Sequence, residues 1–175
     1  MAYTAKALML LAVLGLAACN NPDRYGAGGA GGAGGAGGAG GIGSQGLGGP
    51  SDPNSVAYFN QTIGDRVLFL VDQSTLSPEA QTILAQQAQW LQSHADYAII
   101  VEGHADEQGT REYNLALGAR RASAVQNYLI SQGVAAHRMR TISYGKERPV
   151  EVCPSEACFS KNRRAVTVLS MGAGA

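Results

Sequence analysis

Two oppositely charged side chains, Asp106 and Arg121, are the strongest candidates in this chain for binding a charged ligand. A carboxylate binds an ammonium group, and a guanidinium binds a carboxylate, through charge-assisted hydrogen bonds. Asp106 follows an apolar run that reads as a strand, whereas Arg121 lies in a run of helix-forming residues. If the fold brings the two together, they could hold a zwitterion between them.

Arg121 is predicted to lie in a helix over 111–132, which starts after Thr110 as N-cap and stops at Gly133. Residues four apart share one face of a helix. On the face that contains Arg121, the other residues at this spacing are apolar: Leu117, Val125 and Leu129. An unpaired buried charge is costly, so Arg121 needs an anionic partner from the protein or from a ligand. A structural salt bridge, or a packed stem with a solvated head, remains the alternative at this point.

The elements that must position these residues alternate along the chain. Strands are expected over 67–71, 97–102, 140–144 and 164–170, and a helix opens at Ser77-Pro78-Glu79 ahead of the helix over 111–132. The resulting order, βαβαβ(α)β, has its bracketed helix in the long segment before the last strand. It predicts an α/β fold, a two-layer sandwich of a mixed sheet with helices on one face.

Composition limits the class of protein. With 175 residues, 45% of them hydrophobic and 15% charged, the chain can bury one core. Lys plus Arg and Asp plus Glu are 13 each, so no overall field would recruit a polyanion. We therefore expect a single folded domain and no nucleic-acid partner.

Residues 1–18 read as an export signal. The apolar run that ends at Ala18 is too short to span a hydrocarbon core of about 30 Å. Leu16-Ala17-Ala18-Cys19 resembles a bacterial lipobox, in which the cysteine is lipidated. Asn20 stands where inner-membrane lipoproteins have an aspartate, which favours the outer membrane. An ordinary secretory peptide with an incidental cysteine is the alternative.

Residues 19–55 are predicted to be a flexible tether, because 26–49 is a Gly-Gly-Ala repeat without bulky core residues. The folded domain is expected over 56–175. Its two cysteines, Cys153 and Cys158, form an even pair in an exported chain, which suggests a disulfide. With His94, His104 and His137 as the histidines of the chain, no cluster of metal ligands is visible.

A series of motifs occurs in order over 67–169. They are Phe69-Leu-Val-Asp72, Gly103-His-Ala-Asp106, Gly109-Thr110, Glu112-Tyr-Asn114, Leu117-Gly-Ala-Arg-Arg121-Ala122, Ser143-Tyr-Gly145, Arg148-Pro149 and Asn162-Arg-Arg164. This series resembles the OmpA-like peptidoglycan-binding domain family. The whole arrangement, with signal, lipidated cysteine and tether, is similar to the peptidoglycan-associated lipoproteins of the Tol-Pal system.

The resemblance implies a non-enzymatic wall anchor without cofactor or metal. In the family, the domain binds the diaminopimelate of the peptidoglycan stem peptide, and the roles of amine and carboxylate ligand fall here on Asp106 and Arg121. Supporting contacts fall on Asn114, Thr110, Asp72 and Arg164. The implied partners are the stem peptide, the outer membrane through the lipid on Cys19, and TolB with the Tol complex. The implied role is outer-membrane integrity and invagination during cell division.

Two positions depart from the family pattern. Leu70 stands where many relatives have Asp, and Ala105 replaces a frequent threonine. Alternatives to wall binding are a cell-wall hydrolase, for which Glu102, His104 and Asp106 offer acid-base groups, and a purely protein-binding module. We expect Asp106→Ala or Arg121→Ala to abolish peptidoglycan binding while leaving the fold intact.

Overall fold

The computed structural model of the chain describes residues 48–171. The predicted signal peptide, Cys19 and most of the predicted tether lie outside this range, as do the last four residues. Between residues 48 and 171, none of the helices is both long enough and apolar enough to span a bilayer.

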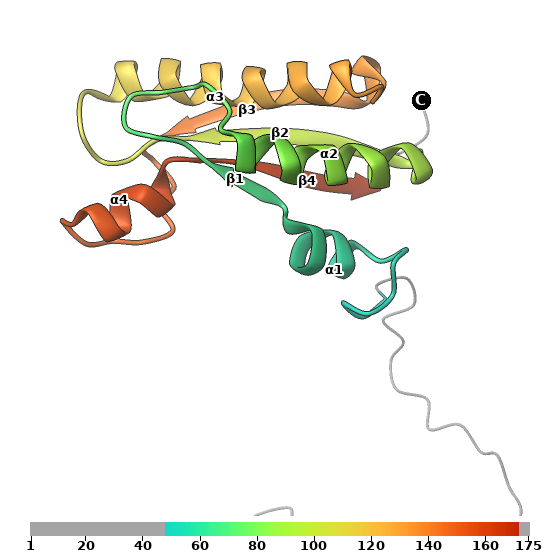
Figure 1. The fold of residues 1–175 in the computed structure, drawn as a ribbon. Helices are drawn as coiled ribbons and strands as arrows, with labels where there is room; N and C mark the ends of the chain where they lie inside the picture. The colour runs from blue at the N-terminus through green and yellow to red at the C-terminus, as the bar shows by residue number, and fades with distance from the viewer. Residues whose placement is uncertain (1–47, 172–175) are drawn as a thin grey trace, which may run out of the picture. The chain divides into compact units, whose positions relative to one another are not determined.

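Helices and strands alternate along the described part of the chain, as Figure 1 shows. Their bounds are α1 Val56–Tyr58, η2 Phe59–Gly64, β1 Arg66–Leu68, α2 Pro78–Ser93, β2 Tyr97–His104, α3 Arg111–Ser131, η3 Ala136–Arg138, β3 Met139–Gly145, α4 Glu156–Asn162 and β4 Arg164–Met171.

The four strands form one mixed sheet in the order β1-β4-β2-β3. β2 and β3 are parallel, with Ile99 opposite Met139, and α3 makes the crossover between them. β4 is inserted antiparallel between β1 and β2. A parallel pair requires such a helical crossover, whereas the antiparallel strand returns through the segment that contains α4. The predicted mixed sheet is confirmed.

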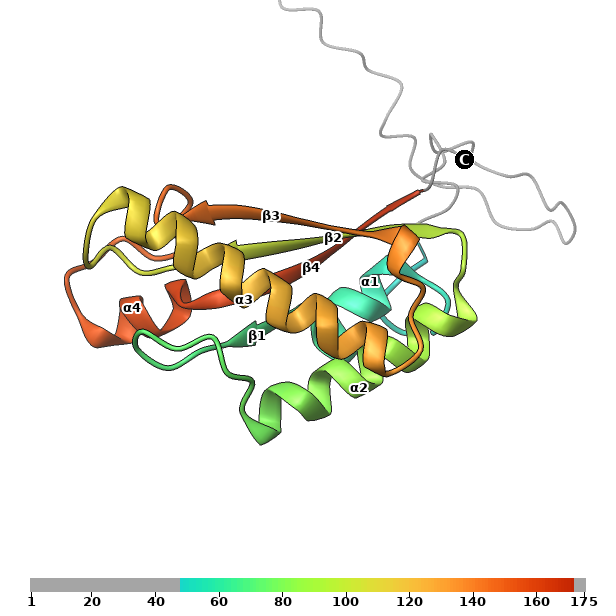
Figure 2. The same cartoon turned by 90° about the horizontal axis from the view of Figure 1, so that it is seen from above.

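One face of the sheet packs against the two long helices. Alternate residues of β2, Ile99 and Val101, are fully buried on that face, and Leu84 of α2 and Leu129 of α3 are fully buried opposite them. Viewed from above, α3 runs across the strands and α2 lies beside it (Figure 2). Serine and threonine caps begin both helices, since Ser77 accepts from the backbone N–H of Ala80 and Thr110 from that of Tyr113. The predicted two-layer arrangement is confirmed.

β1 ends earlier than the sequence predicts. The strand expected over 67–71 ends at Leu68, although the N–H of Phe69 still donates to the carbonyl of Arg163 at 2.9 Å. Asp72 then adopts a left-handed backbone with φ of 57°, and the chain turns away from the sheet. Residues 69–71 leave the sheet despite their strand propensity, because the loop over 69–77 approaches α3. This loop forms one wall of the site described below.

The folded unit also includes residues that the sequence assigned to the tether. The indole N–H of Trp90 donates to the carbonyl of Pro53 at 2.7 Å, and Ser55 caps α1. The helical turns of Val56–Gly64 are likewise absent from the elements predicted from the sequence. Phe59 of that segment is fully buried against Trp90, with ring centroids 5.0 Å apart.

Candidate functional site

Arg121 is fully buried at the point where α3 crosses the end of β2. Its guanidinium donates to the carbonyl oxygens of Gln73 (2.8 Å), His104 (2.8 Å) and Leu70 (3.1 Å). These bonds use three of the five N–H donors that a guanidinium carries. No carboxylate of the described residues lies within salt-bridge distance of it. Arg121 is therefore hydrogen-bonded to backbone carbonyls and not to a carboxylate.

The charge state of Arg121 follows from its surroundings. Burial lowers the pKa of Arg121 to about 10, while the charge of Asp106 acts in the opposite direction. The guanidinium is thus still protonated at neutral pH. Two N–H donors of Arg121 remain after its three backbone bonds, and the fully buried side chain lines a cavity described below.

Asp106 lies just beyond the end of β2 and is 7% exposed. One carboxylate oxygen accepts from Nη1 of Arg163 at 3.0 Å, and the other accepts from the backbone N–H of Gln108 at 3.3 Å. Asp106 and Arg121 are not bonded to each other. They instead line one cavity of about 240 Å³ together with Asn114 and Leu117 of α3.

The loop after β1 closes the opposite wall of this cavity. Val71 and Asp72 line it, and the Asp72 carboxylate accepts a hydrogen bond from the hydroxyl of Tyr113 on α3. This hydrogen bond and the charge of Asp72 raise the pKa of the Tyr113 phenol. Asn114 is buried and donates to the carbonyl of Gln108 at 2.6 Å, which fixes the loop that follows Asp106. The cavity thus has two carboxylates, Asp72 and Asp106, together with a guanidinium and apolar walls.

Comparison with known proteins agrees with this geometry. The sequence model of the OmpA family matches residues 68–163, which hold every residue of the cavity. The chain belongs to the OmpA family.

Several relatives of this OmpA-family chain are highly similar. A peptidoglycan-associated lipoprotein of Mesorhizobium japonicum is 61% identical over 126 residues, which cover 72% of this chain and 74% of the relative. One of Brucella melitensis is 57% identical over the same shares. A crystal structure of the peptidoglycan-associated lipoprotein from Burkholderia pseudomallei matches with a TM-score of 0.62 and 41% identity, over 69% of this chain and 99% of that one.

The cavity contains four of the six ligand-binding residues that the sequence predicts. Asp106, Arg121, Asn114 and Asp72 all line it. Thr110 is exposed and serves as the N-cap of α3, with its side chain accepting from the backbone N–H of Tyr113. Thr110 therefore fixes where α3 begins and is not among the residues that line the cavity.

Arg164 lies outside the cavity. Its guanidinium donates to the carbonyls of Asn162 and Arg148, and it shares a sheet face with its register partner Leu68, which points away from α3. The neighbouring Arg163 contacts Asp106 instead. Consecutive residues at a strand end point in opposite directions, so strand alternation in the Asn162-Arg163-Arg164 motif could have selected Arg163. Neither Arg163 nor Tyr113 is among the site residues that the sequence predicts.

His104 also points away from the cavity. Its ring is 2% exposed and stacks on Tyr144 on the sheet face opposite α3, with centroids 5.5 Å apart. Neither ring nitrogen has a hydrogen-bond partner in the described part of the chain, and Glu102 lies 3.6 Å from Nε2. His104 therefore reaches the cavity only through its backbone carbonyl, which binds Arg121.

Both departures from the family pattern have a place in the structure. The side chain of Leu70 is 66% exposed, and its carbonyl still accepts from Arg121. Ala105 is buried, and its N–H donates to the carbonyl of Gly145 at 2.8 Å. The backbone contacts at both positions are thus independent of the side chain that is missing.

Cys153 and Cys158 are joined by a disulfide that spans the start of α4, with Cα atoms 5.8 Å apart. Among the residues that the structure describes, no three histidine, cysteine, aspartate or glutamate side chains gather as metal ligands would. Cys19, the predicted lipidation site, lies outside the described range.

Proposed function

We propose that this protein is an outer-membrane lipoprotein that binds the diaminopimelate of peptidoglycan without covalent chemistry. In this proposal it tethers the outer membrane to the wall as part of the Tol-Pal system, and so supports outer-membrane integrity and invagination during cell division. The observation that carries the proposal is the cavity in which Asp106 and Arg121 stand unpaired with each other. The names of the relatives, peptidoglycan-associated lipoproteins, support the part of the proposal that concerns peptidoglycan.

The chemistry of the cavity suits the end of a diaminopimelate side chain. That end carries an ammonium and a carboxylate on one carbon, and the cavity offers a carboxylate and a protonated guanidinium. Arg121 retains two N–H donors after its three backbone bonds. Leu117 and Val71 provide apolar walls for the methylene chain. Each charge-assisted hydrogen bond would contribute about 1.5–3 kcal/mol.

A sacculus pull-down tests this function. The full chain in detergent is mixed with insoluble peptidoglycan, and free diaminopimelate is added as competitor. We expect Asp106→Asn to weaken binding by about tenfold or more, because one charge-assisted bond to the ammonium is lost. Asp96→Asn, at an exposed aspartate outside the cavity, is the matched control. Equal retention of the wild type and Asp106→Asn, or no competition by diaminopimelate, would exclude the assignment.

We propose binding rather than hydrolysis because of His104. The acid-base group that the hydrolase alternative needs lies on the other sheet face, where it cannot reach a ligand held by Asp106. Zymography on purified sacculi tests this point. A cleared band that Arg121→Ala retains and His104→Ala abolishes would favour the hydrolase.

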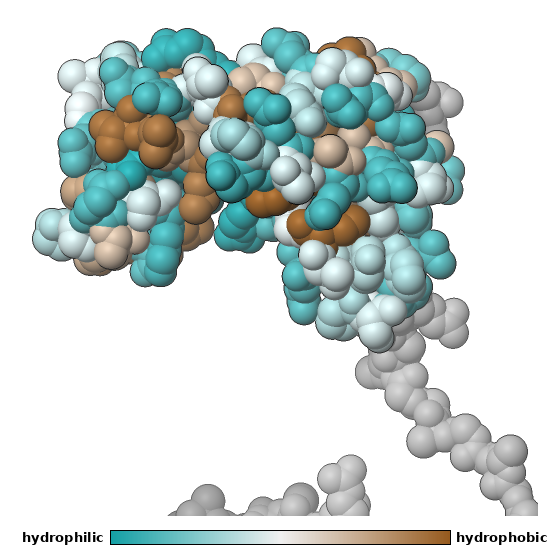
Figure 3. All heavy atoms as spheres, viewed as in Figure 1, coloured by the Kyte–Doolittle hydropathy of each residue, from teal (hydrophilic) through white to brown (hydrophobic). Residues whose placement is uncertain are grey.

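A protein partner at the mouth of the cavity is a compatible second function. Leu70 and Val71 expose 66% and 55% of their surface, and Tyr113 exposes 44%. Figure 3 shows hydrophobic side chains gathered over the loop between β1 and α2. We propose TolB of the Tol complex as the partner, with the wall peptide as its competitor. If diaminopimelate failed to displace TolB, the two ligands would bind at different sites.

A further inference from the structure

Asp106 is not a free carboxylate. Arg163 is 4% exposed and donates from Nη1 to Asp106 at 3.0 Å, while its Nε donates to the carbonyl of Phe69 at 3.3 Å. A ligand ammonium must therefore share Asp106 with a buried cation. An isolated Asp106–Arg163 pair would be neutral and would attract an ammonium weakly.

A second carboxylate offsets Arg163. Glu156, in the first turn of α4, accepts from Nη1 of Arg163 at 3.3 Å and also from Nη2. Hydrogen bonding to Arg163 lowers the pKa of Glu156, and the same bond raises the pKa of Arg163. Both shifts favour the charged forms of Glu156 and Arg163. The side chains of Asp106, Arg163 and Glu156 thus form a row of carboxylate, guanidinium and carboxylate.

The charges of this row act on a ligand together with that of Asp72, which also lines the cavity. Asp106 and Glu156 contribute two negative charges and Arg163 one positive charge, which leaves one negative charge for an ammonium. Arg121 supplies the positive charge for a carboxylate. Without Glu156, Arg163 would interact with Asp106 alone, and this pair would add no net charge to that of Asp72, the other carboxylate that lines the cavity.

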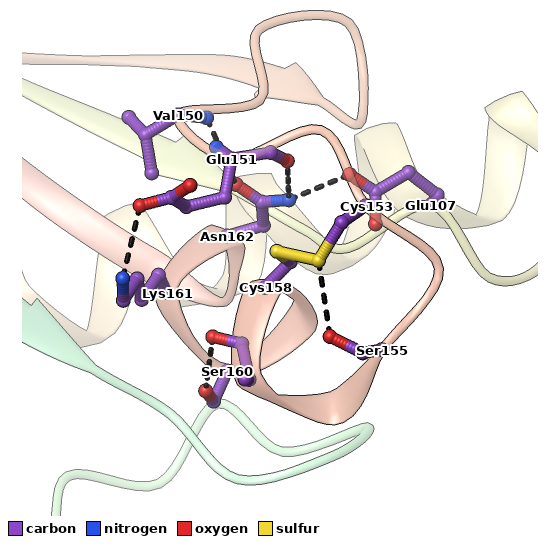
Figure 4. Close-up of a disulfide and its surroundings, with 10 residues drawn as sticks. Glu107, Val150, Glu151, Cys153, Ser155, Cys158, Ser160, Lys161 and Asn162 are labelled. Atoms are coloured by element: carbon purple, nitrogen blue, oxygen red, sulfur yellow. Dashed lines mark hydrogen bonds and ion pairs between the residues drawn. A yellow bond between two sulfur atoms is a disulfide. The ribbon is translucent and has the colours of Figure 1, made fainter.

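Covalent and polar constraints fix the segment that carries Glu156, whose side chain is itself 66% exposed. It lies inside the loop that the Cys153–Cys158 disulfide closes. At the other end of α4, Asn162 donates to Oε1 of Glu107 at 2.6 Å and accepts from the N–H of Val150 at 2.8 Å. Figure 4 shows the Asn162 amide between these groups, close to the disulfide. α4 is therefore fixed relative to the segment that carries Asp106.

We propose that Arg163 and Glu156 are positioning residues that hold Asp106 and set the affinity of the site for an ammonium group. In this inference the disulfide restricts the backbone of the loop and so keeps Glu156 within reach of Arg163. The inference rests on the proposed function, since it concerns the ligand of the same cavity. Glu156 touches no ligand and acts through Arg163.

Calorimetric titration of the full chain in detergent tests the inference with two probes. Diaminopimelate carries both ammonium and carboxylate groups, whereas pimelate has the carboxylates alone. We expect Glu156→Gln to weaken diaminopimelate binding about fivefold, which corresponds to about 1 kcal/mol, and to leave pimelate binding unchanged. Glu156→Asp should restore part of the loss. The double variant Cys153→Ser/Cys158→Ser should shift affinity in the same direction as Glu156→Gln.

Glu151→Gln is the matched control, because Glu151 pairs with Lys161 at 2.9 Å in the same region. It should change neither titration. If Glu156→Gln weakened both probes equally, or neither, the inference would be overturned while the proposed function stood. If the wild type bound no diaminopimelate, the proposed function and this inference would both be wrong.

Discussion

Gly103 of β2 and Gly118 of α3 meet backbone to backbone, so that a Cβ added to Gly103 would lie 1.8 Å from the carbonyl oxygen of Gly118. A Cβ on Gly118 would lie 2.4 Å from Oγ of Ser143. This close approach brings α3 down onto the sheet. It is what allows Arg121 to reach the carbonyl of His104 at 2.8 Å.

Gly118→Ala should therefore destabilise the domain and disturb the cavity together. Overpacking of this kind costs typically about 1–3 kcal/mol, and displacement of α3 would lengthen the bond from Arg121 to His104. Urea denaturation measures the loss of stability, and the sacculus pull-down measures the effect on ligand binding in the cavity. Ala116→Gly, on the same helix, controls for helix propensity. A variant as stable as the wild type would show that α3 can move without cost.

Arg121→Ala should lower the stability of the fold as well as the affinity for peptidoglycan. From the sequence we expect an intact fold, but the guanidinium ties Leu70, Gln73 and His104 to α3. Its loss leaves carbonyls without donors, and each buried unsatisfied group costs about 1–3 kcal/mol. We expect a lower urea midpoint for Arg121→Ala and little change for the exposed neighbour Arg120→Ala. Unaltered stability in Arg121→Ala would mean that the residue serves ligand binding and not the fold.

Asp72 offers a separate test of backbone conformation. Its φ of 57° lies in the left-handed region, which costs roughly 1 kcal/mol for a residue with a Cβ other than Asn or Asp. Asp72→Gly and Asp72→Ala remove the same carboxylate and the same bond from Tyr113. Asp72→Gly should nevertheless be the more stable of the two by about 1 kcal/mol in chemical denaturation. Equal stabilities would mean that the loop relaxes out of this conformation.

His104 should make the fold sensitive to acid. Burial lowers the pKa of His104 to about 4, aided by the charges of Arg164, Arg148 and Arg66, and Glu102 is the carboxylate nearest to the ring. The unfolded chain binds this proton near pH 6.5, above the folded pKa. Stability from this group is therefore complete above pH 6.5 and is lost as pH falls towards 4, by roughly 3 kcal/mol.

The difference in unfolding free energy between pH 6.5 and pH 4 measures this loss. We expect a smaller difference for His104→Gln than for the wild type. His137→Gln, at an exposed histidine, should keep the wild-type difference. The same pH dependence in all three proteins would contradict a buried neutral imidazole.

The sequence itself determined the order of helices and strands, because caps, apolar periodicity and strand alternation are local properties. Ser77 and Thr110 cap the helices as predicted. The motifs around Asp106 and Arg121 also identified two residues that share one cavity. The end of β1 was placed wrongly, because Leu70 and Val71 have strand propensity but leave the sheet to approach α3.

Only the tertiary structure decided what surrounds each charge. Arg163 meets Asp106 across 57 residues of sequence, and Arg121 meets Leu70 across 51. Adjacent arginines look alike in a sequence, yet Arg163 turns to the cavity and Arg164 to the other sheet face. Contacts over such separations depend on how α3, α4 and the sheet pack together. Their geometry therefore exists only once the whole domain has folded.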